Sequence, residues 1–81
     1  MENKKDITSL IDVKDGQIGI VISILGGKIL TKRLADLGLA SGTEVKVIGR
    51  TLFSGPIQIE VSGSRLVIGA GLASKIIVEF K

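Results

Sequence analysis

The chain has 81 residues, and its 11 Lys and Arg against 8 Asp and Glu leave a formal net charge of +3. It contains no His, Cys, Trp or Tyr. These absences exclude disulfides, thiolate nucleophiles, imidazole bases and the commonest transition-metal ligands. The length predicts one domain. The composition favours a non-catalytic binding or regulatory module over an enzyme, and we predict no catalytic residue and no cofactor.

The hydropathy pattern argues against a membrane span. The longest apolar stretch, residues 18–27, falls well short of the roughly 20 residues that a spanning helix needs. No long apolar core follows Lys4 and Lys5, as a signal peptide would require. We therefore expect a cytoplasmic protein. The basic residues are spread out, with no Tyr or Trp for base stacking, so we expect no binding to nucleic acid.

The first third of the chain predicts a tail and then a strand. Residues 1–6 are polar and predict a disordered tail, with the folded domain over residues 7–81. Residues 7–13 are compatible with a short strand or a turn. Residues 17–25 carry isoleucine at every second position, which predicts a strand. Its alternate positions are also small or apolar, so we expect much of both faces to be buried.

Residues 28–37 change to a helical period. Leu30, Leu34 and Leu37 fall at i, i+4 and i+7 and predict one apolar stripe. Gly38 follows directly, where a left-handed residue commonly closes a helix.

The remainder predicts short strands. Residues 44–50 and 57–62 alternate apolar and polar side chains, and a tight turn at residues 62–64 predicts a hairpin with residues 65–68. Residues 69–74 are compatible with a loop or one helical turn, and residues 76–80 predict the last strand. Five short strands and one short helix after the first strand predict a mainly β fold, a small barrel. Closing the sheet would remove its exposed edges.

Two groups of residues are candidates for a docking surface. The helix carries Lys28, Lys32 and Arg33, which form either a docking face or an ordinary solvated surface. Leu52 and Phe53 stand in a loop between two strands, either tucked under the barrel or offered to a partner. The carboxylates show no metal-site spacing, so the metal ligands, if any, stay unknown.

The segment from Lys32 to Val45, KRLADLGLASGTEV, resembles the signature of the FeoA family of ferrous iron transport. The matching residues are Arg33, Leu34, Leu37, Gly38, Leu39, Gly42 and Val45. Further matches follow in order at Gly55-Pro56-Ile57, at Val61, Gly63, Arg65 and Leu66, and at Ala73, Ile76 and Val78. The resemblance extends over about residues 7–81.

The resemblance implies an SH3-like barrel and a regulatory role in iron homeostasis. It implies docking on the cytoplasmic GTPase region of the ferrous iron transporter FeoB, with membrane contact only through that partner. The predicted partner-binding residues are Lys28, Lys32, Arg33, Leu34, Leu52 and Phe53. The alternative is an SH3-like peptide- or metal-binding module related to the C-terminal domain of iron-dependent repressors. Weak self-association through a strand edge is also left open, with no edge indicated.

Overall fold

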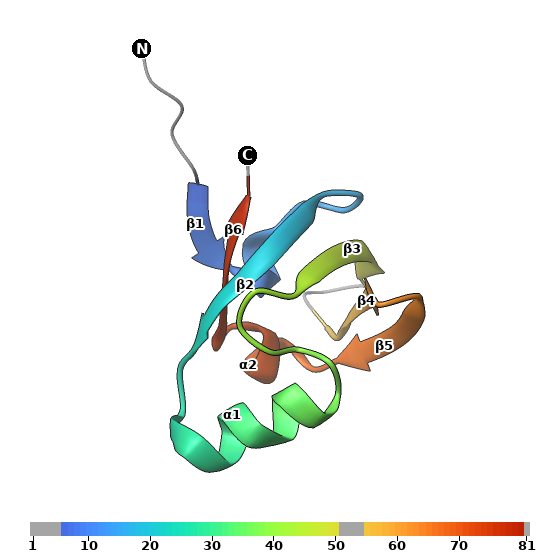
Figure 1. Cartoon of the computed structure of the whole chain (residues 1–81). Helices are drawn as coiled ribbons and strands as arrows, with labels where there is room; N and C mark the ends of the chain where they lie inside the picture. The colour runs from blue at the N-terminus through green and yellow to red at the C-terminus, as the bar shows by residue number, and fades with distance from the viewer. Residues whose placement is uncertain (1–5, 51–54, 81) are drawn as a thin grey trace.

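The computed structural model describes residues 6–50 and 55–80. Its elements are β1 (Asp6–Ser9), the 3₁₀ helix η1 (Leu10–Asp12), β2 (Ile18–Ile24), α1 (Gly27–Asp36), β3 (Glu44–Arg50), β4 (Ile57–Val61), β5 (Ser64–Ile68), α2 (Ala70–Ala73) and β6 (Ile76–Phe80). The strands form one antiparallel sheet in the order β1-β6-β2-β3-β4-β5, with α1 below it in Figure 1. The prediction of a mainly β fold with one short helix is confirmed.

The N-terminal region adds a strand to the five that were predicted. β1 pairs with β6 in the register Ile7↔Glu79, so α1 follows the second strand of the chain. The tail predicted over residues 1–6 lies outside the described residues except for Asp6, with which β1 begins. Residues 10–12, left open as strand or turn, form η1, and Leu10 of η1 is fully buried.

The sheet wraps around the core without closing by hydrogen bonds among the described strands. β1 and β5 stay at its two edges. The prediction that closure removes the edges is therefore wrong for the part of the chain that the structure describes. η1 instead follows β1 directly and brings Leu10 and Val13 into the core beside residues from the sheet and α1.

Strand alternation predicts the buried face correctly in β4. Ile57, Ile59 and Val61 all lie in the core, as expected. In β3, Val45 and Val47 are buried, and the register shifts between Val47 and Gly49. This β-bulge explains why Ile48 interrupts the simple pattern, because one extra residue changes which side the next one faces.

The isoleucines of β2 do not form the buried face throughout. Gly19 and Val21 point into the core, whereas Ile18 is 48% exposed and Ile20 is also exposed. The register shifts between Val21 and Ser23, after which Ile24 packs against the core. The expectation of burial on much of both faces is therefore wrong for the first half of β2, and the bulge then reverses the parity, so that Ile24 faces the core although Ile18 and Ile20 do not.

Candidate docking surface on α1

The start of α1 is set by two glycines with positive φ. Gly26 has φ +135° and Gly27 has φ +86°, conformations that L side chains rarely adopt. A Cβ at Gly26 would lie 2.7 Å from Cδ2 of Leu30. The glycines therefore let the chain turn sharply out of β2 and let Leu30 pack over the turn.

The end of α1 follows the predicted capping pattern. Gly38 has φ +94°, its N–H donates to the carbonyl of Ala35 at 2.9 Å, and the N–H of Leu39 donates to the carbonyl of Leu34 at 2.8 Å. This pair of bonds is a Schellman motif. Leu39, fully buried, anchors the cap in the core. Both ends of α1 are thus held by backbone geometry, which orients its exposed side.

The apolar stripe of α1 is narrower than predicted. Leu34 is 1% exposed and Leu30 is partly buried, but Leu37 is 52% exposed because it is already the C-cap residue, where the chain turns toward Gly38. Leu34 was predicted as a partner-binding residue. Because its side chain lies in the core, a partner has no access to it, and its role is packing.

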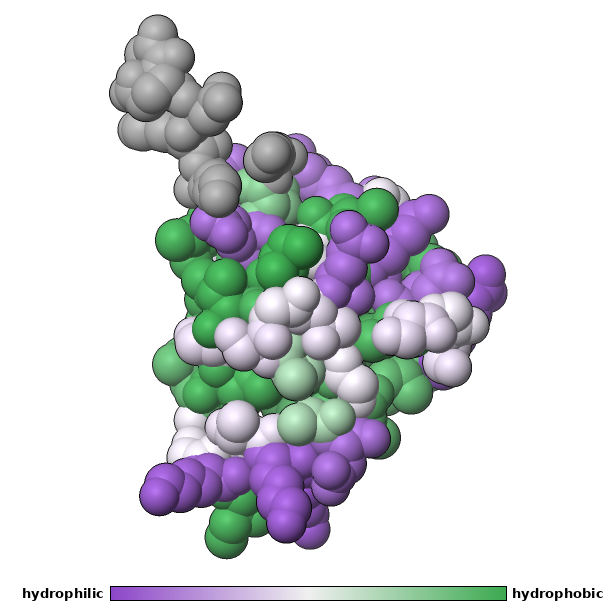
Figure 2. All heavy atoms as spheres, viewed as in Figure 1, coloured by the Kyte–Doolittle hydropathy of each residue, from purple (hydrophilic) through white to green (hydrophobic). Residues whose placement is uncertain are grey.

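The exposed side of α1 carries three cations and one large apolar side chain. Lys28, Lys32 and Arg33 are all exposed, as the docking prediction requires. Ile29 lies among them and is 80% exposed. Residues three and four apart are neighbours on a helix surface, so Ile29 lies beside Lys32 and Arg33. Figure 2 shows hydrophilic residues gathered over α1 at the lower edge of the molecule, with an apolar projection below them.

Ile29 was missed by the sequence reasoning. It could have been found, because Ile29 is a large apolar residue that lies outside the i, i+4, i+7 stripe of the predicted helix. Leu52 and Phe53, the other predicted docking residues, lie outside the described residues.

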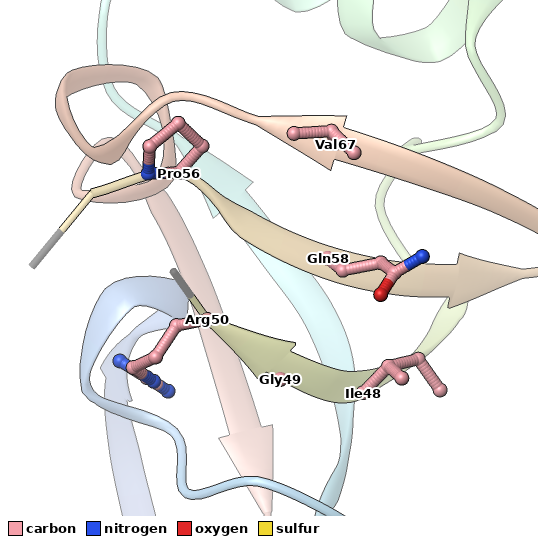
Figure 3. Close-up of a pocket in the computed structure, with 6 residues that line it drawn as sticks. All are labelled: Ile48, Gly49, Arg50, Pro56, Gln58 and Val67. Atoms are coloured by element: carbon pink, nitrogen blue, oxygen red, sulfur yellow. The ribbon is translucent and has the colours of Figure 1, made fainter. Parts of the chain in front are cut away.

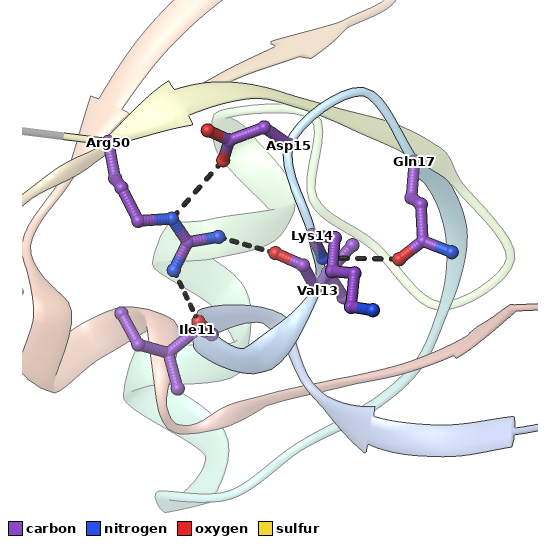
Figure 4. Close-up of polar contacts among 6 residues, drawn as sticks. All are labelled: Ile11, Val13, Lys14, Asp15, Gln17 and Arg50. Atoms are coloured by element: carbon purple, nitrogen blue, oxygen red, sulfur yellow. Dashed lines mark hydrogen bonds and ion pairs between the residues drawn. The ribbon is translucent and has the colours of Figure 1, made fainter.

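A second polar site joins the η1–β2 connection to the end of β3. Arg50 donates from Nη1 to the carbonyl of Ile11 at 2.7 Å, from Nη2 to the carbonyl of Val13, and from Nε to Oδ1 of Asp15 at 3.2 Å (Figure 4). The guanidinium thus satisfies two backbone carbonyls and a carboxylate at once. This cluster was not predicted from the sequence, because Arg50 and Asp15 are 35 residues apart.

A shallow apolar groove crosses the outer face of β3, β4 and β5. It has a volume of about 330 Å³ and is lined by Ile48, Gly49, Arg50, Pro56, Gln58 and Val67. Figure 3 shows Val67 projecting from β5 on the same side as Gln58 of β4. Of the described residues that line the groove, Arg50 is the one titratable residue, so they offer no pair of groups for acid–base catalysis.

Neither a metal centre nor a membrane-spanning helix is found in residues 6–50 and 55–80. No three or more Asp and Glu side chains gather there as a metal site would require. No helix of this part is long and apolar enough to cross a membrane.

Comparison with known proteins identifies the family. The model of the FeoA domain matches residues 8–80. A protein of Methanocaldococcus jannaschii described as putative Fe(2+) transport protein A is 41% identical over 66 residues, which cover 82% of this chain and 78% of that protein.

Solved structures agree with the family match. A crystal structure described as the iron uptake regulatory protein FeoA matches with a TM-score of 0.82 and 36% identity, over 93% of this chain and 99% of that chain. The FeoA solution structure from Chlorobium tepidum matches with a TM-score of 0.82 and 29% identity, over 90% and 70%.

The fold also occurs inside a larger protein. A manganese-dependent transcriptional repressor matches with a TM-score of 0.82 at 21% identity, over 98% of this chain and 44% of that one, which shows a shared fold alone. With the domain model matched over residues 8–80, this chain belongs to the FeoA family, and its fold is the SH3-like fold of that family.

Proposed function

We propose that this chain is a cytoplasmic, non-catalytic accessory protein of ferrous iron transport, and that it docks on the cytoplasmic GTPase region of a FeoB-type transporter through the exposed side of α1. The family match and the relative described as a putative Fe(2+) transport protein support the iron transport context. The surface of α1 supports the choice of docking site.

The main support is Ile29, because its 80% exposed side chain stands among three cations. A large aliphatic side chain left in water on a short helix contributes little to folding. Placed at the centre of a contact, it would be shielded from water and would contribute hydrophobic free energy to binding. Lys28, Lys32 and Arg33 around it would form a charged rim that favours an acidic partner surface.

Two charges of α1, those of Lys28 and Asp36, run against its own dipole, whereas Arg33 in the last turn is placed favourably. Lys28 lies in the first turn, where a negative charge is favourable, and Asp36 lies at the last helical residue, where a positive charge is favourable. Such placements cost the helix a few tenths of a kcal/mol each. Lys28 therefore does not serve the stability of the helix, which is a second, smaller support for a role in partner contact.

Binding alone does not regulate a transporter. A docked protein shifts the conformations of its partner only if it binds one of them more tightly than the other. We therefore expect the affinity of this chain for the GTPase region to differ between the nucleotide-bound states of that region.

The test is a titration of isotope-labelled protein with the soluble GTPase region of the transporter from the same organism, followed by NMR shifts. Saturable shifts over residues 27–37 are expected. Lys32→Glu should weaken binding about fivefold or more, since it reverses a rim charge. Lys46→Glu is the matched control, because Lys46 is an exposed lysine on the outer face of the sheet.

Two outcomes would overturn the proposal. Equal weakening by Lys32→Glu and Lys46→Glu would mean that only net charge matters. An absence of shifts at a partner concentration of about 1 mM would exclude a contact of useful strength.

A further inference from the structure

β5 is an edge strand whose outer side has backbone groups without a partner in the described structure. It pairs with β4 in the register Val61↔Ser64, Glu60↔Arg65, Ile59↔Leu66, Gln58↔Val67 and Ile57↔Ile68. Among the described strands, none lies on its other side. No backbone hydrogen bond joins β5 to any described element other than β4.

The hairpin turn decides which groups of β5 face outward. The two loop residues both have positive φ, +51° at Ser62 and +82° at Gly63, as a type I′ turn requires. In such a turn the flanking residues, Val61 and Ser64, exchange hydrogen bonds.

Bonded and non-bonded pairs then alternate along the ladder. Leu66 and Ile68 therefore bond to β4. The N–H and C=O groups of Arg65 and Val67 point away from it, toward the open edge.

We propose that this edge pairs with β5 of a second copy of the chain, in an antiparallel register centred on Leu66. Arg65 and Val67 stand symmetrically about Leu66, so a twofold axis through Leu66 places Arg65 of one copy opposite Val67 of the other. Each such pair exchanges two hydrogen bonds, which makes four in all by symmetry. The result is one continuous antiparallel sheet across two molecules.

Side chains and charges fit this register. Arg65 and Val67 project on the outer face, where Val67 is 69% exposed and lines the groove shown in Figure 3. The stem of Arg65 from the second copy would lie across Val67 and cover it. Arg65 stands opposite Glu60 on β4, and Glu60 in turn stands opposite Lys46 on β3. Arg65 would therefore lie between Val67 of the second copy on one side and the carboxylate of Glu60 in its own chain on the other.

β5 also lacks most features that protect natural edge strands. Edges are commonly blocked by Lys, Pro or a bulge. β5 has one charged residue, Arg65, and its register with β4 runs without a bulge. β1, the other edge, has only four residues and begins with Asp6. The longer, regular edge of β5 is the better match for self-pairing.

The first experiment follows amide hydrogen exchange and sedimentation of the wild-type protein from about 20 µM to about 2 mM, a range suited to weak association. We expect a dimer to form as the concentration rises. The amides of Arg65 and Val67 should slow by about fivefold or more, while those of Leu66 and Ile68 stay protected at every concentration. A monomer throughout, or slowing at β1 instead of β5, would overturn the proposal.

The second experiment uses Val67→Pro. Proline removes the outward N–H of residue 67 and leaves untouched the bonds that Leu66 and Ile68 make to β4. Two of the four intermolecular bonds are lost, so the dissociation constant should rise about tenfold or more. Val67→Thr, which keeps the N–H, is the control and should dimerise as the wild type does. An unchanged dimer in Val67→Pro refutes the pairing. If that variant fails to fold, the amide hydrogen exchange rates of Arg65 and Val67 in the wild-type protein decide whether the edge of β5 pairs.

Discussion

Replacing Leu34 by alanine tests whether α1 is held by this one side chain. Leu34 is the one residue of α1 that is fully buried, at 1% exposed, and it packs in the common core. A buried Leu→Ala change costs about 2–5 kcal/mol, from lost transfer free energy and the cavity left behind. A domain of 81 residues has a total unfolding free energy of roughly 4–12 kcal/mol. We expect a loss of about 3 kcal/mol, a large share of that total.

Urea denaturation followed by circular dichroism measures this loss. With a slope of about 1 kcal/mol per molar urea, the low end for small proteins, the midpoint should fall by about 3 M. Ile29→Ala on the same helix is the matched control. Because Ile29 is 80% exposed, its truncation should change the unfolding free energy by less than about 0.5 kcal/mol. Equal losses in the two variants, or a loss below about 1 kcal/mol for Leu34→Ala, would refute the assignment of Leu34 to the core.

Four further substitutions test the polar cluster and the backbone. Arg50→Ala should cost about 1–3 kcal/mol, because two carbonyls and Asp15 lose their donor, and the melting temperature should fall by about 4–8 °C per kcal/mol. Asp15→Asn should lower the unfolding free energy by less than about 1 kcal/mol, since its ion pair with Arg50 is half exposed. Measured by chemical denaturation, the difference in unfolding free energy between this variant and the wild type should shrink as salt is added, because salt screens the pair. Gly38→Ala should cost about 1–2 kcal/mol, because φ is +94° there, whereas Gly71→Ala in α2, with open space and an ordinary φ, should be neutral or stabilising; thermal melts of both variants check this.

Local signals predicted those elements whose geometry is decided within a few residues. Ser62-Gly63 predicted the β4–β5 hairpin because a two-residue turn needs residues that tolerate positive φ. Gly38 after a leucine-bearing helix predicted the cap of α1 for the same reason. The alternation in β4 predicted its buried face, since no bulge disturbs its register with β5.

Features that depend on distant pairing were not predicted. The bulge in β2 reflects its pairing with β6, more than 50 residues later in the chain, and because of it Ile18 faces outward whereas Ile24 packs against the core, although their even spacing predicts one face. β1 becomes a strand only because β6 lies beside it. Arg50 likewise gains its role from carbonyls near residues 11–13, which its own neighbours in the sequence do not indicate.

The candidate site was predicted in part, because charge indicates which side chains of α1 are exposed but does not separate an exposed apolar residue from a buried one. Charge alone identified Lys28, Lys32 and Arg33, which the structure places on the exposed side. Leu34 was also included among the predicted partner-binding residues, although its periodicity with Leu30 and Leu37 already indicated the side that faces the core.

A short helix held by two glycine turns and one buried leucine needs few of its other side chains for folding. Gly26 and Gly38 fix where α1 begins and ends, and Leu34 fixes which side faces the core. The exposed residues between them are then free to vary with little effect on the unfolding free energy. An exposed isoleucine beside Lys32 and Arg33 contributes little to the stability of such a helix. It becomes favourable only when a surface of opposite charge covers it, which is why we place the contact with the transporter on α1.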